Sequence, residues 1–253
     1  MDGQERVELT LLGGWDLRVD GTSQPVGFRQ QRLIAALAVF GRRSRGFLAG
    51  LLWPECTEAH ALGSLRAAVF TVSRRLPGVL ACCGRELCLG EAVDVDLHRL
   101  RRALVSAASE AWVADPWWFA SSSNADLLPG WYDDWVVTEQ QRLHDLYLAA
   151  AERLAETALE RHDHFTARHL AEVARGIDPL RESATRILLQ AHLAMGNEAT
   201  ALSVFREYSA TLADELGARP APRIAALIAP VRRERGLSRP LRTPVGGGRW
   251  VRP

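Results

Sequence analysis

The sequence lacks lysine, long apolar runs and a leader-like N-terminus. All 31 of its basic residues are arginine, which we attribute chiefly to GC-rich codons. No apolar run approaches the ~18 residues that a membrane-spanning helix needs, so we expect no membrane contact. The opening segment MDGQERVELT is acidic and lacks the charged and then apolar layout of a secretory signal. We therefore expect a cytoplasmic protein, in which reducing conditions disfavour disulfides.

Signatures of catalysis and of metal binding are also missing. The sequence contains no G-x-S-x-G, G-x-G-x-x-G or H-E-x-x-H motif, and no P-loop motif. Two clusters resemble metal sites: Cys82, Cys83 and Cys88, and His162, His164 and His169. The cysteines lack the C-x-x-C spacing usual for zinc, and the histidines suit solvated positions near a helix start. We therefore predict no enzyme, no cofactor and no metal, and keep a metal-dependent enzyme as the least favoured alternative.

Charge is distributed unevenly, although the whole chain carries a formal net charge of only +1. Residues 27–80 hold eight arginines against Glu55 and Glu58, which makes this segment +6. Residues 105–230 hold ten arginines against eighteen acidic residues, which makes that segment −8. A basic segment on a nearly neutral protein is expected of a module that binds a polyanion and is joined to a part with another role.

The N-terminal segments predict a small sheet followed by helices. Residues 7–26 alternate between apolar and polar side chains and are broken by a glycine pair and an Asp-Gly turn, which predicts antiparallel strands. From Arg29 the apolar residues recur at helical spacing, which predicts a helix that ends at Gly41, a residue that suits a C-terminal cap. A short apolar helix over 47–53 then stops at Pro54.

A third helix contains the stretch SLRAAVFTVSRRLPG, residues 64–78. At about 100° per residue, Leu65, Val69, Val72 and Leu76 share one face, which we expect to pack on the core. The opposite face mixes small, apolar and cationic residues: Gly63, Arg66, Ala67, Phe70, Thr71 and Arg74. Arginine bonds guanine edges or phosphates, and Ala, Thr and Phe can contact the methyl group of thymine. This face is therefore predicted to read DNA.

The next segment, VLACCGRELCLG, predicts two short strands that turn at Gly84-Arg85 and place Arg85 at a hairpin tip. A sheet, three helices and a hairpin together make a winged helix-turn-helix. The candidate DNA-binding residues are Ser64, Arg66, Ala67, Phe70, Thr71, Arg74 and Arg75 in the third helix, Arg85 in the hairpin, and Arg42, Arg43 and Arg45 after the first helix. We expect the last three to hold the DNA backbone or to meet another protein.

The second half of the chain is helical by period and contains an internal repeat. The pattern at Thr166-Ala167 recurs 34 residues later at Thr200-Ala201, and Leu154 recurs as Leu188. This is the tetratricopeptide period, and stacked helix pairs of that type leave a concave surface that binds protein segments. The sequence therefore predicts an interaction module.

Two further segments carry expectations of their own. The connection over 114–134 is rich in tryptophan, and we expect Trp117, Trp118, Trp131 and Trp135 to plug helix ends, with a ligand or partner surface as the alternative. Asp133-Asp134 is predicted to cap a helix rather than to act as a carboxylate pair.

The predicted fold is mainly α, with a winged helix-turn-helix followed by an all-α tetratricopeptide-like domain. We place the first domain at 1–95 and the second at 96–230. The tail 231–253 has seven arginines, three prolines and a triple glycine, and is predicted to be disordered.

Several of these segments resemble those of the Streptomyces antibiotic regulatory proteins. The resemblance rests on LWPE before the third helix, LRAAVFTVSRRLPG within it and VDVDLHRL after the hairpin, and covers roughly residues 7–230. In the second half, LLPGWYDDWVVTEQQRL and the segment from DPLRESATRILLQ to ELGARPAP resemble the bacterial transcriptional activator domain. The chain departs from the family in the middle of the third helix, where Leu62, Gly63, Phe70 and Thr71 replace the Arg, Asn or Gln often found there.

This resemblance implies a cytoplasmic DNA-binding activator of a secondary-metabolite (antibiotic) gene cluster. It implies double-stranded DNA with direct repeats near promoters as one partner, the RNA polymerase holoenzyme as another, and a homodimer at least on DNA. The alternative is a tetratricopeptide-type adaptor whose DNA-reading helix has degenerated, which the departures at Gly63, Phe70 and Thr71 favour.

Overall fold

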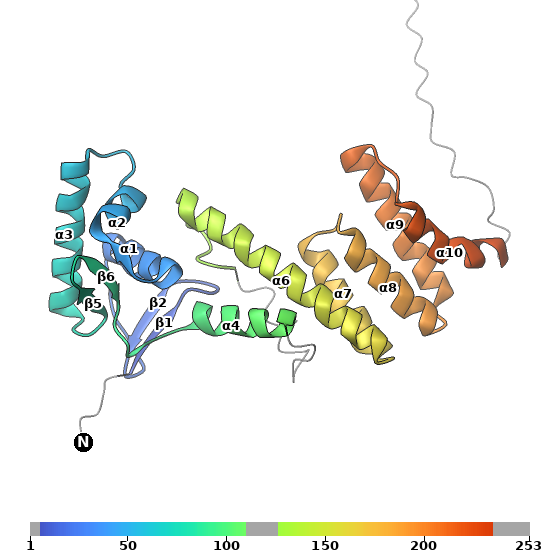
Figure 1. The fold of residues 1–253 in the computed structure, drawn as a ribbon, viewed down its shortest axis with the longest axis horizontal. Coiled ribbons are helices and arrows are strands. Elements are labelled where there is room, and N and C mark those ends of the chain that lie inside the picture. Colours follow the sequence, from blue (N-terminus) through green and yellow to red (C-terminus); the bar gives the residue numbers. More distant parts are fainter. Residues whose placement is uncertain (1–5, 110–125, 235–253) are drawn as a thin grey trace, which may run out of the picture.

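The computed structural model describes residues 6–109 and 126–234, and these are mainly helical. A mixed N-terminal half lies at one end of the elongated molecule, and helices continue from it to the other end (Figure 1). The N-terminal elements are β1 Val7–Thr10, β2 Asp16–Val19, β3 Thr22–Ser23, α1 Phe28–Phe40, β4 Arg43–Ser44, α2 Arg45–Leu52, α3 Glu58–Arg75, β5 Leu80–Cys83, β6 Glu86–Leu89 and β7 Val93–Val95. The helical half contains α4 Asp96–Ser109, α6 Asp134–Glu160, α7 His164–Ile177, α8 Glu182–Ala194, α9 Glu198–Leu216 and α10 Pro222–Glu234.

The first sheet has the strand order β3-β2-β1-β7. Its β1–β2–β3 meander is the predicted antiparallel sheet, in which Leu9 and Leu17 face each other and are buried. The turn at Asp20-Gly21 has φ of 48° and 78°, which explains the Asp-Gly pair, because both residue types tolerate positive φ. Strand β7 pairs in parallel with β1 and was not predicted.

The three predicted helices of the winged helix-turn-helix are present. Every residue of α1 from Leu33 to Val39 is buried. Gly41 ends that helix with φ of 72° and an N–H bond to the carbonyl of Leu37 at 2.9 Å, as the C-cap prediction requires. Helix α2 ends one residue before Trp53 and Pro54. The winged helix-turn-helix prediction is thus confirmed in its helices and in its first sheet.

The second sheet, with the order β4-β6-β5, forms the wing. Strands β5 and β6 are the predicted hairpin with Gly84 and Arg85 at its turn, while β4 adds a third strand that the sequence did not reveal. Gly90 closes the base of the wing, and its N–H bonds the carbonyl of Val79 at 2.9 Å. A Cβ atom at position 90 would lie 1.9 Å from the carbonyl oxygen of Gly78, so only glycine fits there.

The helical half confirms the repeat. Helices α6–α7 and α8–α9 are the two pairs that the 34-residue period predicts, and Ala167 and Ala201 occupy the first turns of α7 and α9, fully buried. Leu154 and Leu188 are equivalent buried positions of α6 and α8. Helix α10 packs against α8 and α9 and extends to Glu234. The first four residues of the tail expected over 231–253 are therefore helical, and 235–253 lies outside the described residues.

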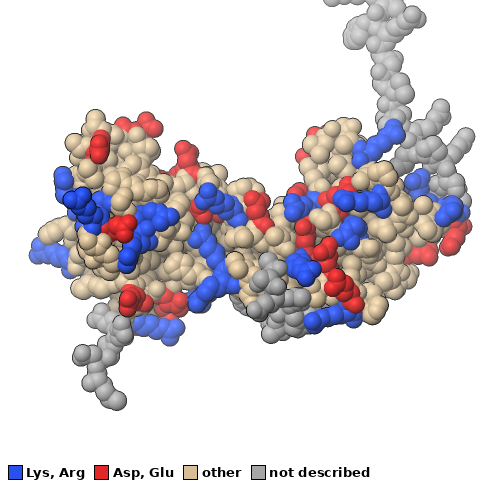
Figure 2. Space-filling view, in the orientation of Figure 1, with Lys and Arg blue, Asp and Glu red and all other residues tan. Residues whose placement is uncertain are grey.

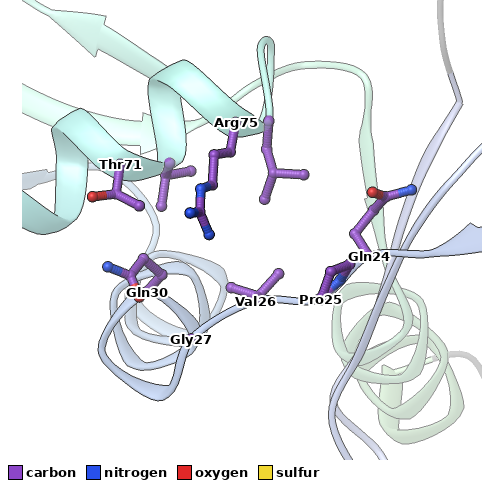
Figure 3. Close-up of a pocket in the computed structure, with 9 residues that line it drawn as sticks. Gln24, Pro25, Val26, Gly27, Gln30, Thr71 and Arg75 are labelled. Carbon is purple, nitrogen blue, oxygen red and sulfur yellow. The ribbon is translucent and has the colours of Figure 1, made fainter.

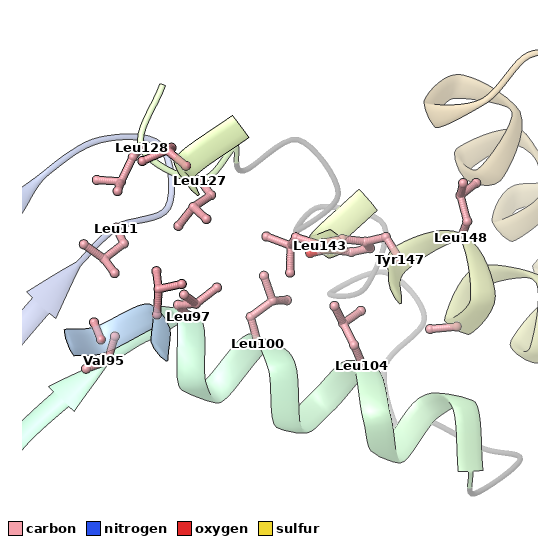
Figure 4. Packing of buried hydrophobic residues seen from close by; sticks show 14 of the residues in the cluster. Leu11, Val95, Leu97, Leu100, Leu104, Leu127, Leu128, Leu143, Tyr147 and Leu148 are labelled. Atoms are coloured by element: carbon pink, nitrogen blue, oxygen red, sulfur yellow. The ribbon is translucent and has the colours of Figure 1, made fainter. Parts of the chain in front are cut away.

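A continuous apolar cluster joins the two halves (Figure 4). Leu11, which follows β1, meets Leu127 and Leu128, which precede α6, while α4 and α6 contribute the rest. The α4 and α6 side chains in this cluster are Leu97, Leu100, Leu104, Leu143, Tyr147 and Leu148. The carboxylate of Asp96 accepts the N–H groups of Leu11 and Leu12 at 3.0 Å, so the start of α4 is tied to the end of β1.

Candidate nucleic-acid interface

Helix α3 has the two faces that its sequence predicts. Leu65, Val69, Val72 and Leu76 are all buried, with at most 9% of their surface exposed. They pack where α3 meets α1 and α2. The prediction that these four residues pack on the core is confirmed. Their burial fixes which side of α3 faces solvent.

The outward face of α3 carries the candidate DNA-reading residues. Arg66, Ala67 and Arg74 are exposed, and Phe70 is 65% exposed. Ser64 and Thr71 are half-buried at its margins, and the hydroxyl of Thr71 donates to the backbone carbonyl of Ala67 at 2.9 Å. The methyl group of Thr71, rather than its hydroxyl, is therefore the part left for a thymine contact.

Arg75 lines a cavity beside this face. About 490 Å³ of open space lies between the C-terminal half of α3 and the connection from β3 to α1. Its lining residues are Gln24, Pro25, Val26, Gly27, Gln30, Thr71, Val72, Arg75 and Leu76. Figure 3 shows the Arg75 side chain extending from α3 toward Val26 and Gln30. Arg75 is thus the α3 arginine that the structure places at the edge of the reading face rather than within it.

The remaining candidates gather on the wing sheet. Arg85 is exposed at the β5–β6 turn. Because β4 pairs with β6, Arg42 and Arg43 lie beside the hairpin, and Arg45 begins α2 next to them. Arg42 bonds the sulfur of Cys83, and Arg43 lies over the ring of Phe47 with 5.4 Å from its guanidinium carbon to the ring centroid.

The charges of the two halves are arranged differently. Basic side chains lie over the end of the molecule that holds α3, with acidic ones near them, and basic and acidic side chains are interspersed over the helical half (Figure 2). Within the described residues, none of the seven candidate arginines forms an ion pair with a carboxylate. Arg168, Arg181, Arg186 and Arg223 of the helical half each do. Cations left without carboxylate partners on one surface favour binding of a polyanion.

The N-terminal half, which carries α3 and the wing, is joined to the helical half by polar contacts that sequence reasoning missed. Arg32 of α1 forms an ion pair with Asp133, and the two side chains are only 17% and 16% exposed. Asp133 does occupy the N-cap position of α6, but its carboxylate makes no capping bond. The prediction that Asp133 caps a helix is confirmed in its position, while its carboxylate bonds the guanidinium of Arg32 instead of an N–H group of α6. A spacing of 101 residues gives no sequence signal for such a pair.

Two of the four tryptophans of the predicted loop lie in the same joint. Trp131 stacks with Trp15 at 6.1 Å between ring centroids and contacts Phe28 at 5.0 Å. Trp135 is buried against Phe40. These rings pack between the first sheet, α1 and α6, so they join the two halves rather than simply plugging helix ends. Trp117 and Trp118 lie outside the described residues.

Helix α4 adds a second set of bonds to α1. A ring nitrogen of His98 lies 2.6 Å from the carbonyl of Ala38, and Arg101 donates to the carbonyl of Val39 at 2.9 Å. Arg101 also reaches Glu139 of α6 at 2.8 Å. The C-terminal turn of α1 is therefore bonded to α4, and through Arg101 to α6.

The described part of the chain holds neither a metal-binding cluster nor a membrane-spanning helix. Among residues 6–109 and 126–234, no group of three or more His, Cys, Asp or Glu side chains is placed to hold a metal ion. In the same ranges no helix combines the length and apolar character needed to cross a membrane.

Known proteins share this architecture. The model of the bacterial transcriptional activator domain matches residues 91–232. The regulatory protein AfsR of Streptomyces coelicolor is 30% identical over 222 residues, which are 82% of this chain and 22% of AfsR. The transcriptional regulatory protein EmbR of Mycobacterium bovis is 28% identical over 260 residues, 92% of this chain and 65% of EmbR. The chain thus spans less than two thirds of the length of either relative.

A solved structure agrees in fold. Mycobacterium tuberculosis EmbR, determined in complex with a low affinity phosphopeptide, superposes with a TM-score of 0.68 at 24% identity and covers 94% of this chain and 67% of that one. The family match spans more than half of the present sequence, and the relatives are transcriptional regulators. The chain therefore belongs to the bacterial transcriptional activator domain family, and its resemblance to the Streptomyces antibiotic regulatory proteins is confirmed.

Proposed function

We propose that this chain is a DNA-binding transcriptional activator that inserts α3 into the major groove. One observation carries the proposal: seven arginines without carboxylate partners in the described residues surround α3 and the wing, with Ala67 and Phe70 exposed between them. Arg66 and Arg74 supply forks for guanine or phosphate, and the apolar side chains suit thymine methyl groups. Arg85 reaches a neighbouring groove or phosphate from the wing tip.

We further propose that residues 1–95 read DNA and that residues 96–230 act on the transcription machinery. In this proposal two copies bind direct repeats near a promoter in the cytoplasm, contact the RNA polymerase holoenzyme, and activate a secondary-metabolite cluster. Membership of the activator-domain family supports the regulatory role. The stacked helix pairs α6–α7 and α8–α9 support a protein contact, because repeats of this kind present a surface for binding protein segments.

Arg74→Ala tests the reading face. Arg74 lies opposite the buried Leu65 on α3, so its removal should leave the thermal stability almost unchanged. If Arg74 bonds a guanine edge, the variant should lose about 1–3 kcal/mol of binding to cognate sites only. If Arg74 holds a phosphate, binding to all sequences should weaken and the salt slope should fall by about one.

Arg206→Ala is the matched control, since Arg206 is an exposed helical arginine of α9 in the acidic half. The operator itself is obtained by selecting bound sequences from a random DNA library with the full chain. Recovery of spaced direct repeats supports the proposal. An Arg74→Ala variant that folds and binds the selected site with the parent's affinity and salt dependence refutes the reading face.

A second candidate is a protein-interaction adaptor whose α3 no longer reads DNA. It is favoured by the reading face itself, where the hydroxyl of Thr71 is bonded to its own helix and Phe70 offers no hydrogen bond. The two proposals differ in affinity: nanomolar binding to a defined promoter repeat eliminates the adaptor, and failure to select any DNA sequence supports it.

A further inference from the structure

The wing carries a pair of cysteines in direct contact. The Sγ atoms of Cys83 and Cys88 lie 3.6 Å apart. In the β5–β6 register Cys83 pairs with Glu86 and Cys88 with Ala81, so the two cysteines are diagonal neighbours on one face of the hairpin. Both are half-buried. Cys82 is exposed and points to the other face, because successive strand residues alternate.

The two sulfurs have different surroundings. Arg42 donates from Nη2 to the Sγ of Cys83 at 3.1 Å. Cys88 contacts the backbone carbonyl of Ala81 at 3.6 Å, and burial raises the pKa of the Cys88 thiol. Reactive cysteines are found in electropositive, partly exposed positions, whereas buried thiols are less reactive. The wing thus pairs Cys83, to which Arg42 donates directly, with a neighbouring thiol whose pKa is raised by burial.

We propose that Cys83 and Cys88 are a peroxide-oxidised dithiol that forms a reversible disulfide. The Cys83 thiolate attacks the O–O bond of a hydroperoxide, which gives a sulfenic acid on Cys83 and releases water or an alcohol. The Cys88 sulfur then attacks the Cys83 sulfur, and the hydroxyl group leaves as water with the Cys88 proton. In total the two thiols lose two protons and two electrons, and the peroxide is reduced.

The geometry suits this reaction. A disulfide is about 2.05 Å long, so the sulfurs must approach by about 1.5 Å from their present 3.6 Å contact. Both side chains start from the same face of one hairpin, where diagonal neighbours come within reach of each other. Disulfides in reducing compartments are usually transient and redox-sensing, so the expectation that this chain holds no structural disulfide is compatible with the site.

The site adjoins the proposed DNA contacts. Cys83 immediately precedes the Gly84-Arg85 turn, and its partner Arg42 is a candidate phosphate contact. Disulfide formation draws the Cys83 sulfur toward Cys88 and away from Nη2 of Arg42, which now donates to it at 3.1 Å, and this leaves the guanidinium for phosphate. We expect the oxidised chain to bind DNA of any sequence about twofold to fivefold more tightly, the range of one exposed charge contact. This consequence rests on the proposed function, whereas the dithiol chemistry does not.

The experiment treats the full chain with stoichiometric hydrogen peroxide, alkylates the free thiols and maps the tryptic peptides. Trypsin cleaves after Arg85, which lies between the two cysteines, so the disulfide appears as two linked peptides. We expect this link in the parent and in Cys82→Ser, and its loss on treatment with dithiothreitol. In Cys88→Ser we expect a Cys83 sulfenic acid that dimedone traps. Thermal unfolding under reducing conditions confirms that each variant is folded.

Three outcomes overturn the proposal, each at a different step. A parent chain whose Cys83 and Cys88 thiols stay free after peroxide treatment refutes the disulfide. A disulfide that forms in the parent but not in Cys82→Ser shows that Cys82, and not the Cys83–Cys88 pair, carries the reaction. A Cys83–Cys88 bond with unchanged or weaker DNA binding refutes the link to Arg42. Failure of the reduced parent to bind any DNA refutes the proposed function alone, because the peptide map is read without DNA.

Discussion

The ion pair between Arg32 of α1 and Asp133 at the start of α6 gives a quantitative test of how the two halves are joined. Their side chains keep 17% and 16% of their surface exposed. Removing one member of a buried pair costs about 3–5 kcal/mol, because the other charge is left buried and unpaired. Since about a sixth of each side chain here still meets water, we expect about 2–3 kcal/mol for each single replacement.

The replacements are chosen to change the charge and little else. Arg32→Met keeps the apolar stem of the side chain, and Asp133→Asn keeps a residue that is favoured at N-cap positions. The double variant should lose less than the sum of the singles, with a coupling energy of about 1.5–2.5 kcal/mol, because the second replacement removes a charge that the first left unpaired. Urea unfolding followed by tryptophan fluorescence measures all four proteins, and Trp15 and Trp131 report directly on the joint.

A second pair in the same chain serves as the control. Arg168 and Glu172 are spaced i,i+4 on α7, with side chains that are 25% and 42% exposed. Their coupling should be about 0.3–0.5 kcal/mol, as for other surface helix pairs. A coupling between Arg32 and Asp133 no larger than this control value would refute the reasoning, because the joint would then gain nothing specific from the pair.

Three further predictions concern the N-terminal half and the helix α4 that follows it. Leu65→Ala should lower the free energy of unfolding, measured in urea, by about 2–5 kcal/mol, because Leu65 is fully buried. A loss below about 1 kcal/mol would place Leu65 outside the core. Gly90→Ala should lower the melting temperature, since its Cβ would meet the Gly78 carbonyl at 1.9 Å, and an unchanged melting curve would contradict that packing. A fragment 1–109 should resist proteolysis better than 1–95, which lacks α4; equal resistance would show that α4 adds no stability to the sheet.

Patterns of short period were predicted well from the sequence. The buried stripe of α3 follows from the helical repeat, because one side of a helix that packs on a core must be apolar at every third or fourth residue. The turns at Asp20-Gly21 and at Gly84 follow from residue types that accept positive φ. The helix pairs of the second half follow from one repeat, since identical spacing places Ala167 and Ala201 at equivalent buried points.

Features that depend on distant partners were not predicted. Strand β4 is two residues long, too short to show a period, and exists because β6 offers it backbone bonds. Strand β7 has only three residues and is fixed by β1, more than eighty residues earlier. The N-cap position of Asp133 was predicted from the local sequence, whereas the guanidinium of Arg32 that binds its carboxylate is brought there only by the fold. The DNA contacts themselves stay a prediction.

Helix α1 is the element through which the two halves affect each other. It packs on α3 with its buried residues, holds Asp133 through Arg32, and offers the carbonyls of Ala38 and Val39 to α4. Because α1 supports α3 and also contacts the helical half, we expect α3 and the helical half to move together as one nearly rigid body. In the proposed function, where two copies bind direct repeats, two such readers gain avidity from linkage only if the pairing of their helical halves matches the spacing of the DNA sites. On that proposal, the helical half sets the geometry in which α3 reaches DNA.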